Sequence, residues 1–273
     1  MNRYTWRTGV LEAVMIIVGL IYLIPIYMLV NLSLKPEGDL YNPLVPTIHP
    51  TFDNFVNAWQ QANLGSAIVY TVVLTVISIT VLVLISSTAG YVLARVTAGW
   101  SKLVFALFMI GLLLPLQLGV FPLYTTMRDL GLLNTIWALA IYYCGLLAPF
   151  SVFLYTTFLR SLPLEYEEAA TLDGAGPLRI WWSVVFPLSR AVTGTVIILN
   201  AIGVWNDFFT PLLYLSGSSQ QTIPVALYAF IGQFVSRWQL VFAGLIIAVI
   251  PILIVYFILQ RYIIKGFAGG LKG

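Results

Sequence analysis

Long apolar runs dominate this 273-residue sequence and decide the solvent in which it can fold. Each run is about 20 residues or longer, which is the length that an α-helix needs to cross the hydrocarbon core of a bilayer. The runs are continuous rather than alternating, so a membrane β-barrel is excluded. We therefore predict an all-α, polytopic membrane protein with six transmembrane helices, over Val10–Leu34, Ala67–Ala94, Leu103–Leu123, Trp137–Leu159, Ala191–Leu215 and Leu240–Ile264.

Composition and proline placement agree with this assignment. Hydrophobic residues make up 60% of the chain and charged residues 8%. Soluble domains are about a quarter charged, so a water-soluble globular enzyme is ruled out. Proline would end a helix in water, but in a membrane bundle the neighbouring helices can satisfy the freed backbone groups. We expect kinks rather than helix ends at Pro25, Pro115, Pro122, Pro149, Pro211 and Pro251.

Basic residues flank the runs unevenly, and this sets the orientation because Lys and Arg are retained on the cytoplasmic side. Arg3 and Arg7 precede a first run that is too long for a signal peptide and lacks a cleavage site, so we expect a retained helix. With the N-terminus inside, ten basic residues fall on the cytoplasmic side, and Lys35, Arg128 and Arg237 fall outside. Both termini are predicted to be cytoplasmic.

Several kinds of chemistry can be excluded from the residues that the chain lacks. Cys144 and His49 are the only cysteine and histidine, so a His/Cys metal site and a histidine-based nucleophilic triad are ruled out. No GxxxxGK[ST] phosphate loop occurs, and any ATP-driven work must come from a partner. The basic residues are scattered singly, which argues against nucleic acid as a partner. We predict no catalytic and no metal-binding residues.

The predicted cytoplasmic loop over residues 161–190 contains two short helices. The first begins near Ser161, taken as its N-cap, carries three glutamates toward its positive end and finishes at Gly174, where a left-handed turn is expected. The second follows Pro177. One interpretation is a plain interfacial loop, in which Trp181 and Trp182 form an aromatic belt and the glutamates are solvated.

A spaced motif favours a different interpretation of this loop. Glu168-Ala169-Ala170 is followed after three residues by Gly174 and, after nine more, by Val184-x-Phe186-Pro187. This pattern resembles the EAA loop of permease subunits in ATP-binding-cassette importers, with Val and Phe where Ile and Leu are usual. The resemblance implies that the loop docks on an ATPase subunit, and the residues to which it assigns coupling are Glu168, Ala169, Ala170, Asp173, Gly174 and Pro187.

Other segments resemble the carbohydrate branch of the same family, in particular the smaller permease subunit of the maltose transporter. They are Leu114–Gln117, Leu130–Thr135, Trp205–Leu212 and Gln260–Gly266.

That resemblance implies the partners and the location of the chain. The partners are a second permease subunit, two ATPase subunits carrying ATP and Mg²⁺, an extracytoplasmic sugar-binding protein, the sugar and membrane lipid. The location is a prokaryotic inner or plasma membrane, and no cofactor belongs to the chain itself. Residues 1–62 would form the first membrane helix and outer segment, and residues 63–273 a five-helix permease core. The glycine-rich tail Phe267–Gly273 would follow a helix end at Lys265 and reach between the ATPase subunits.

Polar residues within the predicted spans are candidates for the transport pathway. They are Gln117 in the third span and Trp205, Asn206 and Asp207 in the fifth. A buried acid is costly in a bilayer and normally faces a pathway or a partner. The alternatives are helix packing for the tryptophan, interhelical hydrogen bonding for the amides, and a structural ion pair of Asp207 with Arg237 or a buried hydrogen bond.

Rival functions from other classes are open on the sequence alone. An autonomous secondary transporter or channel would place charged groups at the membrane midplane, whereas Asp207 of this sequence lies off centre. A membrane-embedded enzyme would need paired acids or a histidine cluster. Within the family, a permease for amino acids, peptides or oxyanions is a further alternative.

Overall fold

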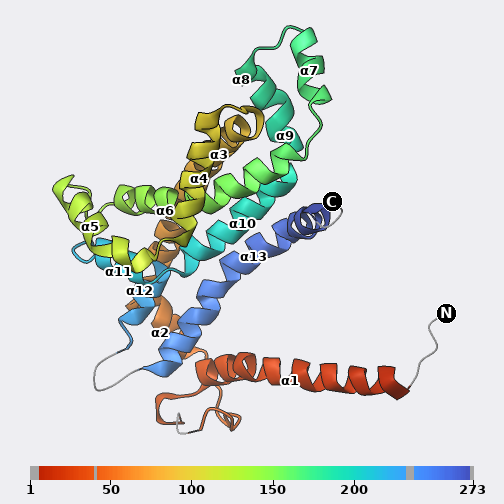
Figure 1. The fold of residues 1–273 in the computed structure, drawn as a ribbon. Helices are drawn as coiled ribbons and strands as arrows, with labels where there is room; N and C mark the ends of the chain where they lie inside the picture. Colours follow the sequence, from red (N-terminus) through yellow and green to blue (C-terminus); the bar gives the residue numbers. More distant parts are fainter. Residues whose placement is uncertain (1–5, 40–41, 232–236, 271–273) are drawn as a thin grey trace. The chain divides into compact units, whose positions relative to one another are not determined.

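The structure is a computed structural model that describes residues 6–39, 42–231 and 237–270, and every regular element in those ranges is a helix (Figure 1). The longer helices coincide with the apolar runs of the sequence, some over the whole run and others over only part of it. In chain order the elements are α1 (Trp6–Leu34), η1 (Glu37–Asp39), α2 (Asp53–Gln61), α3 (Leu64–Arg95), α4 (Gly99–Leu113), α5 (Leu116–Asp129), α6 (Ile136–Arg160), α7 (Glu165–Leu172), α8 (Pro177–Ile180), η2 (Trp181–Val185), α9 (Phe186–Leu188), α10 (Arg190–Asn206), α11 (Phe209–Tyr214), α12 (Ile223–Tyr228) and α13 (Trp238–Gly270).

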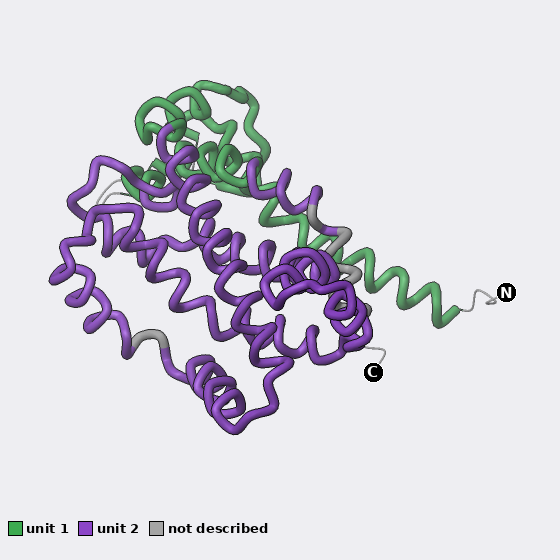
Figure 2. The backbone as a smooth tube through the Cα atoms, turned by 90° about the horizontal axis from the view of Figure 1, so that it is seen from above, with its two compact units in different colours: residues 1–65, 226–250 green, residues 66–225, 251–273 purple. Residues whose placement is uncertain are grey.

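The chain divides into two compact units, drawn in different colours in Figure 2. Unit 1 contains residues 1–65 and 226–250, and unit 2 contains residues 66–225 and 251–273.

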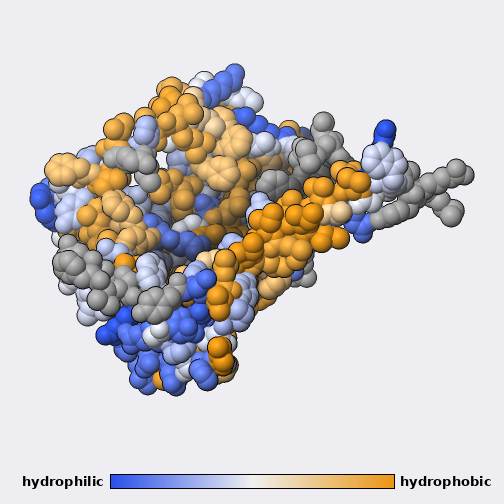
Figure 3. Space-filling model, turned by 90° about the horizontal axis from the view of Figure 1, so that it is seen from below, coloured by the Kyte–Doolittle hydropathy of each residue, from blue (hydrophilic) through white to orange (hydrophobic). Residues whose placement is uncertain are grey.

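In unit 1, α1 is apolar on all sides after its first two turns, which carry Arg7 and Glu12, and its side chains are exposed over most of its length. Exposed apolar side chains also cover much of the face drawn in Figure 3. A helix that is apolar all round lies in lipid or against another chain. This supports a membrane location for α1.

The segment after α1 is tied back onto the end of that helix by buried polar groups. The Asn31 side chain donates to the carbonyls of Pro43 and Val45, at 2.8 and 2.9 Å. The Lys35 side chain is only 1% exposed, and its ammonium group donates to the carbonyl of Asp39 at 3.0 Å. These bonds satisfy groups that would otherwise be costly to bury.

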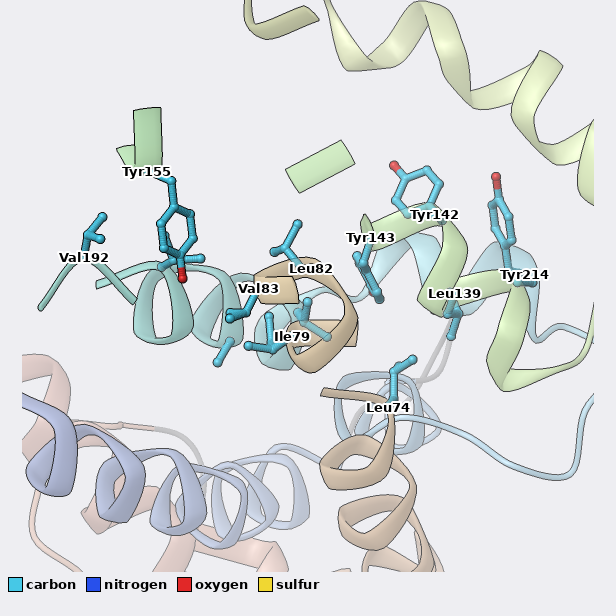
Figure 4. Packing of buried hydrophobic residues seen from close by; sticks show 14 of the residues in the cluster. Leu74, Ile79, Leu82, Val83, Leu139, Tyr142, Tyr143, Tyr155, Val192 and Tyr214 are labelled. Carbon is cyan, nitrogen blue, oxygen red and sulfur yellow. The ribbon is translucent and has the colours of Figure 1, made fainter. Parts of the chain in front are cut away.

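In unit 2, the core lies among α3, α6, α10 and α11. Figure 4 shows Leu74, Ile79, Leu82 and Val83 of α3 in the same cluster as residues of the other three helices. Gly90 brings α3 and α6 close together, because a Cβ atom at this position would lie 2.5 Å from Cβ of Tyr155. The core therefore fixes α3 directly against α6.

Four of the six predicted spans are confirmed as continuous helices long and apolar enough to cross a membrane. They are Trp6–Leu34, Leu64–Arg95, Ile136–Arg160 and Trp238–Ile258. Pro25, Pro149 and Pro251 lie inside α1, α6 and α13, as expected for prolines in a membrane bundle. Two further pairs of helices are bent, so the described residues offer up to six spans if each pair is counted as one.

The predicted third span over Leu103–Leu123 is bent sharply next to Pro115, where a kink was expected, and consists of two helices. The chain breaks between α4 and α5, whose directions differ by 107°. Leu114 and Pro115 have extended backbone at the break, with ψ of 128° and 119°. The residue before a proline is pushed away from helical geometry, which explains the position of the break. Pro122 stays inside α5.

The predicted fifth span over Ala191–Leu215 is divided between two helices, and the division lies at Asp207 rather than at Pro211. α10 ends at Asn206, and Asp207 has extended backbone with ψ of 122°. The short helix α11 starts two residues later, and the Asp207 carboxylate accepts a hydrogen bond from the backbone N–H of Thr210 at 3.2 Å. An aspartate can compete with the helix for backbone donors in this way. Asp207 therefore lies at a helix break.

Candidate functional site

The loop between α6 and α10 lies at one end of unit 2, where α7 and α8 form a hairpin (Figure 1). The prediction of two short helices is confirmed, with α7 as the first and α8 as the start of the second. The second helix continues through the wide π-helical turn η2 into α9. The predicted N-cap is wrong, because Ser161 ends α6 and its hydroxyl donates to the carbonyl of Phe158 at 2.7 Å.

The turn after α7 has the left-handed glycine that the sequence predicted. Gly174 has φ of +80°, and its N–H donates to the carbonyl of Thr171 at 3.0 Å. The N–H of Ala175 donates to the carbonyl of Ala170 at 3.0 Å, which completes a Schellman motif. Ala170 and Ala175 both pack against the core of unit 2. The motif therefore fixes the direction in which α7 meets α8.

The surface of the hairpin combines acidic and apolar side chains. Glu168, Ala169 and Asp173 are exposed, and Pro187 is exposed at the far end of the loop. Leu172 and Leu178 also face solvent, with 90% and 83% of their surface exposed. Apolar side chains at this exposure, next to acids, are typical of a surface that binds another protein.

Sequence reasoning missed the residues that hold α7 in place. Glu167 is largely buried, and its Oε1 accepts from Nε of Arg95 at 2.8 Å and lies 2.7 Å from Nη2. Its Oε2 accepts from the hydroxyl of Tyr91 at 2.9 Å. Both partners belong to α3, more than 70 positions earlier in the chain. Only the adjacency of Glu167 to the motif residue Glu168 could have drawn attention to it.

The second helix is anchored by apolar packing instead. Ile180 and Val185 are buried in the core of unit 2. Trp181 and Trp182 pack on each other with ring centroids 5.5 Å apart, and Trp182 stacks on Phe186 at 5.6 Å. The three rings therefore form one aromatic cluster beside the hairpin.

Three of the four candidate pathway residues have described side chains, and these side chains differ in burial and in hydrogen-bond partners. The side chain of Gln117 lies outside the described residues. Trp205 is buried, and the exposed Asn206 donates to the carbonyl of Ile202 at 2.9 Å. The Asp207 carboxylate accepts from the hydroxyl of Tyr143 at 3.0 Å, in addition to the Thr210 N–H.

Arg237 is the partner that the sequence offers for an ion pair with Asp207. In unit 1 its guanidinium donates to Oε1 of Gln61 at 2.8 Å.

An apolar cavity of about 580 Å³ lies within unit 2. Most of its wall comes from α3 and α10, and Trp205 lines it. Besides Trp205, the only lining residues whose side chains carry polar atoms are three threonines. The lining residues are Val72, Thr75, Val76, Ile79, Thr80, Val83, Leu84, Phe186, Thr193, Ile197, Ala201, Trp205, Pro251, Ile252 and Val255.

Comparison with known proteins identifies a protein family whose model matches most of the chain. The family model described as "Binding-protein-dependent transport system inner membrane component" matches residues 86–269, which include the whole loop from α7 to α9. The matched range is more than half of the chain.

Individual relatives match over nearly the full length. The chain is 36% identical over 260 residues to the melibiose/raffinose/stachyose import permease protein MelC of Bacillus subtilis, covering 94% of each chain. It is 31% identical over 256 residues to the probable starch degradation products transport system permease protein AmyC of Thermoanaerobacterium thermosulfurigenes, covering 93% of each.

A solved structure shares the fold. It belongs to a bacterial ABC transporter involved in the import of the acidic polysaccharide alginate, and the TM-score is 0.82 at 23% identity. The match covers 96% of this chain and 100% of the other.

Proposed function

The chain belongs to the family of binding-protein-dependent transport system inner membrane components, and from this membership we propose that it is the permease subunit of an ATP-driven sugar importer. Members of this family are transport permeases rather than enzymes, and the chain is a multi-pass protein of the bacterial inner membrane. The observation that carries the sugar assignment is the full-length similarity to MelC and AmyC, both named for the transport of saccharides.

The proposed transport mechanism divides the work among several chains. An extracytoplasmic binding protein would deliver the sugar to a pathway formed by this chain and a second permease subunit. Two ATPase subunits, which bind ATP and Mg²⁺, would drive the permeases between outward-facing and inward-facing states. This chain would do no covalent chemistry, and its task would be to convert closure of the ATPase subunits into movement of its helices.

We propose the α7–α8 hairpin as the surface that docks on an ATPase subunit. The exposed Glu168 and Ala169 on α7 and Asp173 at its C-cap support this, since they lie beside the apolar Leu172 and Leu178. Because alanines allow close approach and the Schellman turn fixes the helix direction, the hairpin can present this surface as a rigid unit.

The proposed pathway residues are Gln117, Trp205, Asn206 and Asp207. Trp205 has the strongest support, because it lines the cavity of unit 2 and its ring could stack on the apolar face of a sugar. Asp207 is engaged by Tyr143 and by a backbone N–H, which would keep its carboxylate in a fixed position at the break between α10 and α11.

A reconstituted importer tests the sugar assignment. Proteoliposomes would contain this chain, the second permease and the ATPase subunits, with the binding protein and a radiolabelled α-galactoside or maltooligosaccharide outside. We expect accumulation of at least one of these sugars that requires both ATP and the binding protein. Accumulation of labelled amino acids or peptides instead, with no saccharide, would contradict the assignment.

Both termini are proposed to be cytoplasmic, with residues 1–62 forming the first helix and outer segment and residues 63–273 the core. We expect cysteine at Ile48, which is 84% exposed, to react with an impermeant maleimide added to intact cells. Cysteine at Gly176, where a Cβ has open space, should react only after permeabilisation.

A buried position in the same outer segment as Ile48 serves as a control for the labelling experiment. Asn54 is buried and its amide donates to the carbonyls of Ser33 and Lys35, so cysteine there should label poorly from either side. Labelling of Gly176→Cys but not of Ile48→Cys in intact cells would reverse the proposed orientation.

The C-terminal tail is proposed to reach between the ATPase subunits. α13 runs through Gly270, past Lys265 where the sequence suggested its end, and residues 271–273 lie outside the described residues. Removal of Phe267–Gly273 should lower sugar uptake more than membrane abundance, measured by transport and immunoblot of the same vesicles. Unchanged uptake would make the tail an ordinary frayed terminus.

A further inference from the structure

Two neighbouring acids of α7 face different surroundings. Glu168 is exposed on the surface proposed to dock, whereas Glu167 has only 13% of its side chain exposed. Consecutive residues in a helix point about 100° apart, so one can serve a partner chain while the other serves its own chain. Glu167, which directly precedes the motif, is therefore expected to have a role different from that of Glu168.

Glu167 makes a closed set of contacts with the last turn of α3. The Arg95 guanidinium approaches a single carboxylate oxygen through Nε and Nη2, and Nη2 also donates to the carbonyl of Leu162 at 3.3 Å. The second carboxylate oxygen accepts from Tyr91. Charge-assisted bonds to a planar guanidinium are strong and directional, especially when the pair is shielded from water. We call these three residues, Tyr91, Arg95 and Glu167, the α3–α7 clamp.

The clamp acts on a helix that reaches the cavity. α3 continues without a break from Leu64 to Arg95, and residues between Val72 and Leu84 form a large part of the cavity wall. The clamped end of α3 is held in a second place, where the Arg160 side chain donates to the carbonyl of Leu93 at 3.3 Å. A displacement of α7 would therefore be carried to α3 at the end nearest the hairpin.

We infer that the α3–α7 clamp is a positioning device through which movement of the docking hairpin is passed to the cavity-lining helix α3. This rests on the proposed function. Without the clamp, the hairpin would still present Glu168 to the ATPase subunits, but its movement would be only loosely connected to the transport helix. The clamp residues are positioning residues and need no contact with the sugar.

The test compares transport with ATP hydrolysis in the reconstituted importer. Glu167→Gln keeps the size of the side chain and removes the ion pair. We expect ATPase subunits to copurify and ATP hydrolysis to continue, while the number of sugars transported per ATP falls about fivefold or more. Tyr91→Phe removes one hydrogen bond and should lower the same ratio about threefold. Glu165→Gln, an exposed position on the same helix, is the matched control and should keep the wild-type ratio.

Exchange of the two charges separates coupling from a packing defect. The double variant Arg95→Glu with Glu167→Arg restores an ion pair, and we expect it to recover part of the ratio lost in Glu167→Gln. Wild-type ratios in both Glu167→Gln and Tyr91→Phe would overturn the clamp while leaving the proposed function intact. Failure of wild-type vesicles to couple ATP hydrolysis to sugar uptake would overturn both.

Discussion

Replacement of Gly174 by valine is expected to reduce sugar uptake and binding-protein-stimulated ATP hydrolysis at least about tenfold. Gly174 has φ of +80°, and a Cβ atom at this position would have open space within 4 Å, so backbone conformation rather than crowding is the obstacle. A β-branched residue in the left-handed region costs about 1–3 kcal/mol. Since about 1.4 kcal/mol is a tenfold change in an equilibrium, this cost would shift the loop away from the Schellman geometry by roughly tenfold or more at its middle value.

Two control variants distinguish this cause from general damage to the loop. Gly174→Asn should retain most activity, because asparagine tolerates the left-handed region better than valine. Gly176→Val should also be tolerated, because φ there is −77° and the position is open. Membrane abundance should be equal in all three variants, because Gly174 and Gly176 are exposed. Normal uptake in Gly174→Val would contradict the role given to the turn.

Glu168→Lys is expected to abolish stimulation of the ATPase subunits, with uptake below about a tenth of wild type. Reversal of a charge that is desolvated in an interface costs about 2–5 kcal/mol. The change also places a cation in the first turn of α7, but that effect is only about 0.3–1 kcal/mol. The interface therefore dominates, and the measurement is copurification of the ATPase subunits together with their stimulated activity.

The matched control for Glu168→Lys is the same change on the outer segment. Glu37 is exposed in η1, and Glu37→Lys changes the net charge of the chain equally. We expect it to leave copurification of the ATPase subunits unchanged. If the Glu168→Lys and Glu37→Lys variants retained the ATPase subunits equally, the result would favour the interpretation of this segment as a plain interfacial loop.

The positions of the membrane helices could be predicted from the sequence where a long apolar run marks the whole helix. Trp6–Leu34 and Leu64–Arg95 follow their runs within a few residues. However, hydropathy does not indicate where a helix is interrupted within an apolar run. Pro149 stays inside a helix, whereas Leu114 and Pro115 turn the chain through 107°. The sequence alone does not show which prolines have neighbours that can accommodate the freed backbone groups.

The docking hairpin was predictable in part because its signals are local. Glu168 and Gly174 are separated by less than two helical turns. The positive φ of Gly174 could be predicted because glycine adopts positive φ without a steric cost. The clamp was not predictable in this way. Arg95 and Glu167 are separated by 72 positions, so only the folded chain brings them to 2.7 Å.

The most direct measurement of the permease assignment is native mass spectrometry of the chain purified in mild detergent from membranes of its host. We predict a complex that contains one copy of this chain, one different permease and two ATPase subunits, and that accelerates ATP hydrolysis when a sugar-loaded binding protein is added. A chain that purifies alone or only with copies of itself, and that transports sugar without any ATPase subunit, would contradict the assignment.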